Sequence, residues 1–366
     1  MSQKTRFWLR FVVLPLIGII SIFAVVAVTF LSPAITGAQG LTTPSRTTHP
    51  HVASARNHYS DTQVATRLAT IHTSVIPLDL SGGYVASTSW PVIFVHGFSQ
   101  QSKSDCNSSW GTAKSFLQNN GWHGAIYKVG YYGGDTNCDA ALGSYASNCT
   151  GYNAGNQGTN NEDIRHIACE LAWYIWDNFT QYGQNVQLVG HSMGGLIIRW
   201  ALYATPFDIN LPPYIGVQDA VTFATPHAGI PIAGAAFFIC GECRQAQEMR
   251  NNNAFMVELT NNGQNPQGAG WGTDWSLYGS SCESWFNIFD PGVDWHSSLG
   301  MYSEHKVEFL NPPCYDHGGY LGDTSNSQNL KVDWSSNSGS DSVGNTSSTW
   351  AHSLRAMEQA ISSASN

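Results

Sequence analysis

The segment 186–202 constrains the fold of this chain more than any other part of the sequence. It joins a short apolar run of β-forming residues, the pentapeptide Gly-His-Ser-Met-Gly at 190–194, and an apolar run that suits a helix. A strand that turns sharply into a helix strains the residue at the turn, so the positions two before and two after it must be small. Gly190 and Gly194 meet this requirement around Ser192. The segment therefore predicts a strand, a tight turn that exposes the Ser192 hydroxyl, and a helix.

Apolar runs alternate with helical patterns through the rest of the chain after residue 90. Alternation of this kind is typical of a mainly parallel sheet that helices cover on both faces. The sequence thus predicts an α/β fold of the α/β-hydrolase type. The expected strands are residues 91–96, 125–131, 186–190, 220–224, 275–278 and 306–310.

The clearest helical pattern lies at residues 161–179, where apolar side chains recur at spacings of three and four. We expect Asn161 to cap this helix and Glu162 to lie in its first turn. The other expected elements are helices at 195–202 and 348–361 and a polar loop at 333–345.

The N-terminal segment has the layout of an export signal. Lys4, Arg6 and Arg10 precede an apolar run over residues 11–31, and small residues near Ala38 suit cleavage after it. The same run is long enough to remain as a membrane anchor. In either case we expect the catalytic part to lie outside the cytoplasm, secreted or anchored with an outward face.

We expect three parts in the chain. Residues 1–38 are the signal peptide or anchor, residues 39–85 are a linker rich in Thr, Ser and His, and residues 86–366 form the catalytic domain. Within that domain, residues 230–272 break the alternation of strands and helices, which indicates an insertion over the end of the sheet. Its apolar stretch 232–239 is either part of a lid that opens on lipid or buried core.

The charge of the chain bears on its partners. The formal net charge is −9, and the only charged residues before residue 39 are basic, so cleavage of the export segment makes the protein more acidic. Phosphate binding needs a cationic face. Nucleic acid is therefore not expected as a partner.

Eight cysteines follow the export segment. An even number in an oxidising compartment predicts a disulfide framework. The spacing of Cys240 and Cys243 also suits a zinc or redox motif, but the second ligand pair of a zinc site is absent. We therefore expect no metal and no cofactor. Nearness in sequence favours the pairs Cys106–Cys138, Cys149–Cys169, Cys240–Cys243 and Cys282–Cys314.

A serine hydroxyl is a weak nucleophile, so it needs a base that is itself oriented by an acid. In the α/β-hydrolase fold these residues follow in the order Ser, acid, His. Among the histidines after Ser192, His305 begins an apolar run, His352 lies in the last expected helix, and His227 comes too early to leave room for an acid. His317 lies in a glycine-containing loop after the last of the expected parallel strands and is the predicted base.

The acid should lie in the loop after the strand at residues 275–278. Asp290 begins an Asp-Pro-Gly-Val turn whose valine can anchor the loop, so it is the preferred candidate. Glu283 is nearer the end of the strand and is the second candidate, and Asp294 is the third.

The oxyanion that forms on a carbonyl substrate needs two N–H donors. One donor should be Met193, directly after the predicted nucleophile, and the other should come from the loop after the first core strand. His96-Gly97-Phe98 forms that loop, so Phe98 is the predicted second donor. His96 precedes Ser192 in the chain, which favours a role in shaping the loop over a role as base.

Three segments together carry a resemblance to a known family. They are Val-His-Gly-Phe at 95–98, Gly-His-Ser-Met-Gly-Gly at 190–195 and Thr-Pro-His-Ala-Gly at 225–229. In this order they resemble secreted bacterial triacylglycerol lipases and their actinomycete-type relatives, over about residues 90–323. The resemblance implies an α/β-hydrolase that acts on carboxylic esters, with a triad of Ser192, an acid and His317.

The resemblance is imperfect at the acid. Relatives often carry a Gly-Ser-x-Cys-Asp signature, whereas here Gly-Ser-Ser-Cys at 279–282 is followed by Glu283 and a short insertion before Asp290. Calcium sites of some such lipases have no matching motif here. The departure leaves both carboxylates open as the acid.

The sequence predicts a secreted, monomeric serine hydrolase of the lipase or esterase type. Its partner would be an acyl ester or lipid substrate, with transient binding at a lipid interface. An acyltransferase or a polyester depolymerase would use the same triad. A noncatalytic hydrolase-like surface protein is the alternative of another class, and the intact order of Ser192, acid and His317 argues against it.

Overall fold

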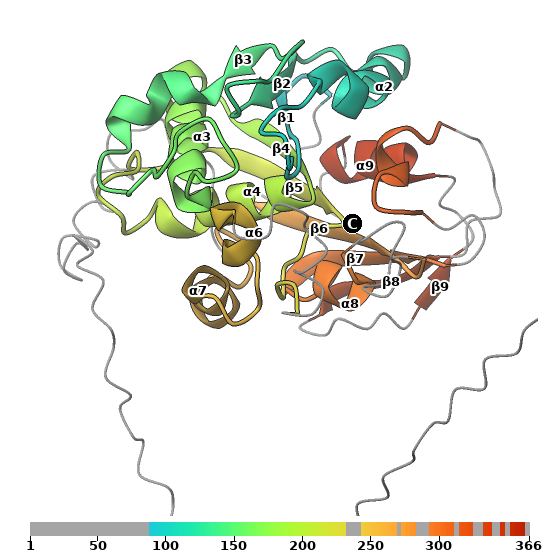
Figure 1. Cartoon of the computed structure of the whole chain (residues 1–366). Helices are drawn as coiled ribbons and strands as arrows, with labels where there is room; N and C mark the ends of the chain where they lie inside the picture. Colours follow the sequence, from blue (N-terminus) through green and yellow to red (C-terminus); the bar gives the residue numbers. More distant parts are fainter. Residues whose placement is uncertain are drawn as a thin grey trace, which may run out of the picture. The chain divides into compact units, whose positions relative to one another are not determined.

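The computed structural model describes residues 88–231, 243–268, 272–282, 293–310, 315–324, 332–338, 345–347 and 352–362 (Figure 1). The predicted export segment, the linker and the apolar stretch 232–239 of the predicted lid lie outside these residues. No helix within the described ranges has both the length and the apolar character needed to cross a membrane.

The strands of the described residues are β1 (Val92–Val95), β2 (Ile126–Gly130), β3 (Ala140–Ala141), β4 (Val186–His191), β5 (Val217–Phe223), β6 (Asp274–Ser280), β7 (Ser303–Phe309), β8 (Val332–Ser338) and β9 (Asn345–Ser347). They form one sheet in the order β3-β2-β1-β4-β5-β6-β7-β8-β9. The neighbours from β3 to β7 all run parallel, and β8 and β9 pair antiparallel at the edge next to β7.

Strand β1 shows why the central strands are continuously apolar. Val92 and Phe94 belong to one hydrophobic cluster, and Ile93 and Val95 belong to another. Successive side chains of a strand point to opposite faces of the sheet. A parallel strand buried on both faces therefore needs apolar residues at every position.

Helices cover both faces of this sheet, as Figure 1 shows. The main ones are α2 (Cys106–Asn119), α3 (Ile164–Asn178), α4 (Met193–Ala204) and α9 (Ser353–Ser362). Trp110 of α2 and Leu354 of α9 pack in the cluster that contains Phe94, whereas Ile167 of α3 packs in the cluster that contains Ile93. A mainly parallel sheet with a helix layer on each face and a strand that turns directly into α4 is the predicted α/β-hydrolase fold.

The shorter helices are α6 (Arg244–Glu248), α7 (Ala254–Asn262), α8 (Trp295–Ser298) and the 3₁₀ helices η1 (Leu142–Asn148), η2 (Thr180–Tyr182) and η3 (Gly319–Leu321). Helices α6 and α7 lie within the predicted insertion 230–272. Phe255 and Leu259 of α7 are buried in the same cluster as α4. The described part of the insertion thus contributes to the core.

All six predicted strands are present, with ends that differ by up to three residues. The polar loop predicted at residues 333–345 is wrong, because β8 covers 333–338 and β9 begins at Asn345. Antiparallel strands at a sheet edge can carry polar residues. Composition therefore gave no strand signal there.

The predicted start of the helix over residues 161–179 is also wrong. Asp163, and not Asn161, is the N-cap of α3, since its Oδ1 accepts a hydrogen bond of 2.8 Å from the backbone N–H of Arg165. Asp163 has extended backbone angles, as N-cap residues do. Glu162 consequently lies before the helix and not in its first turn.

The disulfides Cys106–Cys138 and Cys149–Cys169 are present as predicted. Cys243 and Cys282 are disulfide-bonded as well. Their predicted partners lie outside the described residues, so those two pairings stay predictions.

Candidate active site

Ser192 lies at the turn between β4 and α4 with a strained backbone. Its φ of 54° and ψ of −129° are rare for a residue that has a side chain. The Ser192 N–H donates to the carbonyl of Phe223 at 2.9 Å. Its carbonyl accepts from the N–H of Gly195 at 3.1 Å and from the Thr225 hydroxyl at 2.9 Å. Hydrogen bonds from β5, from the loop after it and from α4 therefore hold the serine in this conformation.

Two glycines allow other backbone segments to approach this turn. A Cβ atom on Gly194 would lie 2.3 Å from the carbonyl oxygen of Val95. A Cβ atom on Gly97 would lie 2.8 Å from the Cβ of Ser192. Both distances are shorter than any real Cβ contact, so these positions exclude side chains. The loop after β1 packs directly on Ser192 as a result.

The hydroxyl of Ser192 is hydrogen-bonded to the imidazole of His317, with Oγ and Nε2 3.0 Å apart. His317 follows β7, three strands from β4 in the sheet. In parallel strands the carboxyl ends meet at one edge, so a loop after β7 can reach the turn after β4. The described histidines include no other with a ring nitrogen bonded to this hydroxyl.

His191 supports His317 from the neighbouring position in the chain. Its Nε2 lies 2.6 Å from the backbone carbonyl of His317, and the two rings are 4.7 Å apart. A carbonyl only accepts hydrogen bonds, so Nε2 of His191 carries a proton. Burial, and then the nearby His317, lowers the pKa of His191 to about 3. His191 is thus a neutral donor that fixes the backbone of His317.

Of the three carboxylates predicted as candidates for the acid, the structure describes one. Asp294 is the N-cap of α8, where its Oδ1 accepts from the N–H of His296 at 3.0 Å and lies 2.8 Å from His296 Nδ1. Asp290 and Glu283 lie outside the described residues. The assignment of the acid therefore stays a prediction.

The loop that contains Phe98 is fixed by its neighbour β2. The hydroxyl of Tyr131, directly after β2, faces two carbonyls, that of Gly97 at 2.6 Å and that of His96 at 2.9 Å. The carbonyl and N–H of one trans peptide point in opposite directions. A hydrogen bond to the Gly97 carbonyl therefore turns the N–H of Phe98 away from Tyr131.

Asp135 holds both segments together. One of its carboxylate oxygens accepts from the N–H of Tyr131 at 2.8 Å and lies 2.9 Å from Nε2 of His96. His96 is 2% exposed and stacks on Tyr131. These contacts agree with a loop-shaping role for His96, as predicted.

Sequence reasoning missed Tyr131, Asp135 and His191 as supporting residues. For Tyr131 a signal existed, because it follows a strand that we expected to be parallel, and the carboxyl ends of such strands share an edge. The hydrogen bond of His191 links residues 126 positions apart, and no local pattern predicts it.

Three histidines that the sequence analysis set aside as the base have partners elsewhere. His227 is fully buried, its Nε2 lies 2.9 Å from the Thr222 hydroxyl, and burial lowers its pKa. His305 pairs with a carboxylate of the neighbouring strand β6, and His352 accepts a hydrogen bond in the first turn of α9. The role of His317 as the base stays a prediction.

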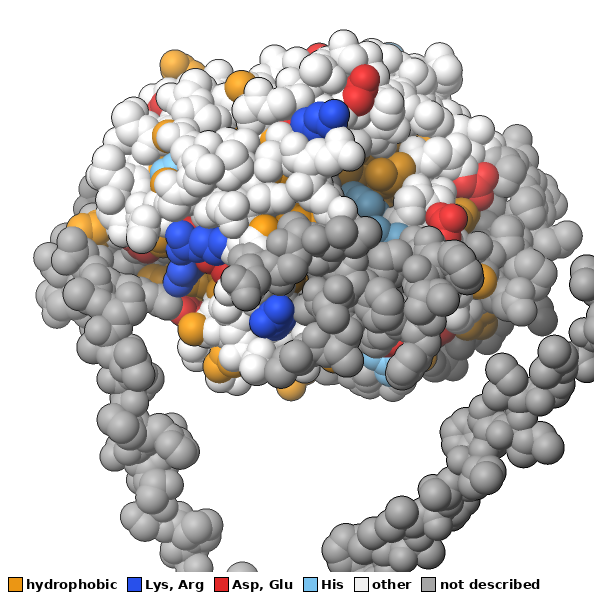
Figure 2. All heavy atoms as spheres, in the orientation of Figure 1, with side chains coloured by type: hydrophobic (Ala, Val, Ile, Leu, Met, Phe, Trp, Pro, Cys, Tyr) orange, Lys and Arg blue, Asp and Glu red, His pale blue; other side chains and the backbone are white. Residues whose placement is uncertain are grey.

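Uncharged side chains and backbone make up most of the described part of the face in Figure 2. Histidine side chains lie beside hydrophobic ones in a hollow of this face.

Part of the chain matches a known family. Residues 145–265, about a third of the chain, match the family described as "Putative serine esterase (DUF676)". The matched segment includes α3, β4, Ser192, α4 and β5. This part of the chain is therefore similar to serine esterases. Comparison with curated proteins gives no match.

Similar solved structures include a lipase, BlEst2 from Bacillus licheniformis, in its propeptide form. It is 17% identical, with 64% of this chain and 48% of that one covered, at a TM-score of 0.43. Phospholipase PlaB from Legionella pneumophila, in complex with thio-NAD, is 16% identical. The match covers 57% of this chain and 44% of that one, at a TM-score of 0.40. Lipase B from Aspergillus fumigatus is 16% identical. The match covers 56% of this chain and 40% of that one, at a TM-score of 0.34. This chain spans about half the length of these structures. Their TM-scores are too low to indicate a substrate for this chain.

Proposed function

We propose that this chain hydrolyses carboxylic esters, with Ser192 as the nucleophile and His317 as the general base. The observation that carries the proposal is the 3.0 Å hydrogen bond between Oγ of Ser192 and Nε2 of His317 at a strained turn between a buried strand and a buried helix. The similarity of residues 145–265 to serine esterases supports the same chemistry.

In this mechanism Oγ of Ser192 attacks the carbonyl carbon of the ester while its proton passes to Nε2 of His317. The tetrahedral intermediate collapses, the carbon–oxygen bond to the alcohol breaks, and His317 returns the proton to the leaving alcohol. Water then gives a proton to His317, attacks the acyl-enzyme and releases the carboxylic acid. Ser192 recovers its proton, so the enzyme is unchanged at the end.

We assign the stabilisation of the oxyanion to the N–H groups of Met193 and Phe98. Met193 is the first residue of α4, where N–H groups lack partners within the helix and favour negative charge. Tyr131 orients the peptide between Gly97 and Phe98, and Gly97 lies against Ser192. This arrangement supports a second donor on the nucleophile side of the loop.

We propose Asp290 as the acid that orients His317, with Glu283 and then Asp294 as the alternatives. Separate replacement of each by Ala identifies it, because loss of the orienting carboxylate lowers kcat by about 10⁴-fold. Because Oδ1 of Asp294 already contacts His296, we expect Asp294→Ala to retain activity close to wild type. If kcat stays close to the wild-type value in each of the three variants, none of these carboxylates orients His317.

We further propose that the natural substrates are acylglycerols and that the protein is exported. The mixed apolar and histidine-lined surface supports a lipid substrate. The disulfides Cys106–Cys138 and Cys149–Cys169 support an oxidising compartment, as does the basic and apolar layout of residues 1–38.

The test uses the full chain with p-nitrophenyl esters from butyrate to palmitate and with a triolein emulsion. We expect hydrolysis, labelling by a fluorophosphonate probe, and loss of both in Ser192→Ala. An added alcohol acceptor and a polyester film distinguish a transferase or a depolymerase from a lipase. A wild-type chain that cleaves no ester and takes up no probe would be a noncatalytic member of this fold.

A further inference from the structure

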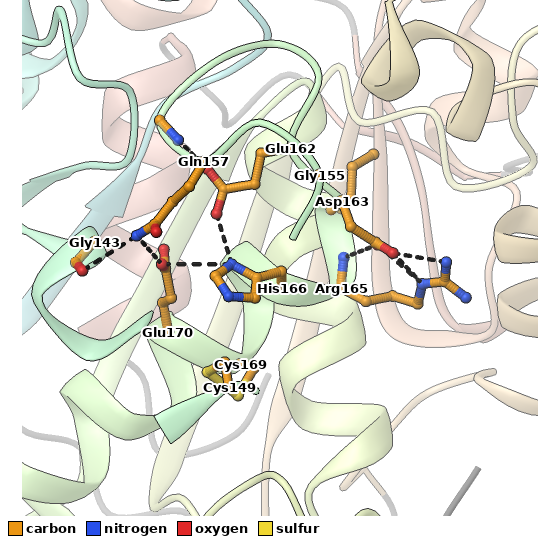
Figure 3. Close-up of polar contacts among 12 residues, drawn as sticks. Gly143, Cys149, Gly155, Gln157, Glu162, Asp163, Arg165, His166, Cys169 and Glu170 are labelled. Carbon is orange, nitrogen blue, oxygen red and sulfur yellow. Dashed lines mark hydrogen bonds and ion pairs between the residues drawn. A yellow bond between two sulfur atoms is a disulfide. The ribbon is translucent and has the colours of Figure 1, made fainter. Parts of the chain in front are cut away.

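A buried cluster of two carboxylates and one imidazole lies at the start of α3, outside the residues used for ester hydrolysis (Figure 3). Glu162 precedes the helix, and His166 and Glu170 follow at intervals of four residues, so they lie along one side of it. All three are at most 2% exposed. One potential ligand atom from each lies within 4.8 Å of the other two.

The contacts inside the cluster converge on one nitrogen. Nδ1 of His166 lies 2.6 Å from Oε1 of Glu162 and 3.5 Å from Oε1 of Glu170. The second oxygen of Glu162 accepts from the backbone N–H of Gly158 at 2.6 Å, and Nε2 of Gln157 lies 3.4 Å from Oε1 of Glu170. Outer contacts of this kind orient the ligands of metal sites.

One oxygen of the cluster has no partner. Oε2 of Glu170 is buried, and no described residue donates a hydrogen bond to it. Buried carboxylate oxygens without partners are rare in folded proteins because the lost hydration is not replaced. The atom therefore points to a bound group that completes the cluster.

The charge of the cluster points to a cation. None of the ion pairs among the described residues joins a lysine or an arginine to Glu162 or Glu170, and the nearby Arg165 pairs with Asp163 instead (Figure 3). The described residues therefore offer no cationic side chain that balances the two buried carboxylates.

We propose that Glu162, His166 and Glu170 bind a divalent transition-metal cation of the zinc type. Imidazole and carboxylate are ligands that zinc accepts, at about 2.0–2.2 Å, which places tetrahedral ligand atoms about 3.4 Å apart. The 3.5 Å between His166 and Glu170 already fits this spacing. The 2.6 Å between His166 and Glu162 must open by about 0.8 Å. Water would take the fourth position. Magnesium and calcium are disfavoured because they prefer all-oxygen sites.

The site has a structural role by its position. Glu162 belongs to the segment that leads into α3, so a bound cation ties this segment to the first two turns of the helix. The disulfide Cys149–Cys169 joins the residue after η1 to the residue next to Glu170. Cation and disulfide would therefore fasten two neighbouring segments to the same helix.

The test measures zinc binding to the full chain after removal of metals with EDTA. We expect one zinc ion per chain in titration calorimetry, and a zinc-dependent rise in Tm of about 5 °C. Glu170→Gln and His166→Gln should each lower the zinc affinity by at least about 100-fold and abolish the rise in Tm. Glu170→Gln has the shape of the protonated carboxyl group, so it should fold.

Asp274→Asn is the matched control. Asp274 is a buried carboxylate that pairs with His305 at 3.2 Å but belongs to no three-ligand group among the described residues. It should keep the zinc stoichiometry and the rise in Tm. A wild-type chain that binds no zinc, or variants of Glu170 and His166 that bind it as tightly as wild type, would overturn the proposal. Neither readout depends on ester hydrolysis, so the two proposals fail separately.

Discussion

The turn at Ser192 and the cluster on α3 concentrate polar groups by opposite means. At Ser192 the backbone itself is strained, and the side chains around it come from loops that follow β1, β2 and β7. In the cluster the backbone of α3 is regular, and His166 and Glu170 meet because they are four residues apart. The first site therefore depends on how strands align, and the second depends mainly on one helix and the segment before it.

This difference decides whether each group of residues can be recognised from the sequence. A strained turn needs glycines at fixed positions, and Gly190 and Gly194 provide a pattern that can be recognised. A helix face needs only a spacing of four, which occurs by chance in many helices. The first site could be predicted, whereas no metal was expected in the second.

The largest expected effect comes from replacing the proposed nucleophile. Ser192→Ala should lower esterase activity by at least about 10³-fold, because it removes the hydroxyl that is bonded to His317. The zinc-dependent rise in Tm should be the same as in wild type. An effect of this substitution on zinc binding would show that the two regions are coupled.

Removing each of the two described disulfides should affect the two regions differently. Cys149 and Cys169 are 20 residues apart, and their joint replacement by Ala should lower the free energy of unfolding by about 3 kcal/mol and weaken zinc binding. The matched control removes Cys106–Cys138, because Sγ of Cys138 and the carboxylate of Asp135 both lie beside Gly130. We expect this control to lower kcat as well. Denaturant titrations measure the loss of stability, and titration calorimetry measures the zinc affinity. If removal of either disulfide weakened zinc binding equally, the contrast between the two regions would be contradicted.

Gly97→Ala should lower kcat/KM by about 10²-fold. The new methyl group would press on the Cβ of Ser192 and displace the loop after β1, and small displacements of reacting groups have effects of this size. Gly111→Ala, in α2, is the control, because its methyl group would meet no atom closer than 3.8 Å. It should keep full activity and raise Tm slightly. Similar kinetics for the two variants would show that the loop tolerates movement.

His191→Gln should have the smallest effect on catalysis, about tenfold in kcat, since a glutamine can still donate to the carbonyl of His317. It should also change the response to pH. The folded pKa of His191, about 3, lies below the unfolded value near 6.5. Its contribution to stability is therefore complete above pH 6.5 and is lost as pH falls towards 3, by about 1 kcal/mol per unit.

Urea titrations between pH 7 and pH 4.5 measure this response. Wild type should lose stability more steeply than His191→Gln over that range. Parallel curves for the two proteins would mean that His191 takes up no additional proton on unfolding.

Much of the fold could be read from the sequence because its signals are local. The six predicted strands are continuous apolar runs, and the apolar period of α3 identified that helix. Errors occurred where two residues compete for one role, as Asn161 and Asp163 do for the N-cap, since the backbone angles decide between them. Strand β8 was missed because its composition is polar.

The sequence alone determined that Ser192 stands at a strand-to-helix turn, and it selected His317 through chain order. Only the tertiary structure decided what surrounds them. Tyr131 and Asp135 fix the loop before Phe98, and His191 fixes His317, across separations that no local pattern records. The physical reason is that backbone strain and periodicity are properties of neighbouring residues. Convergence of distant side chains on one hydroxyl depends instead on how separate segments of the chain pack.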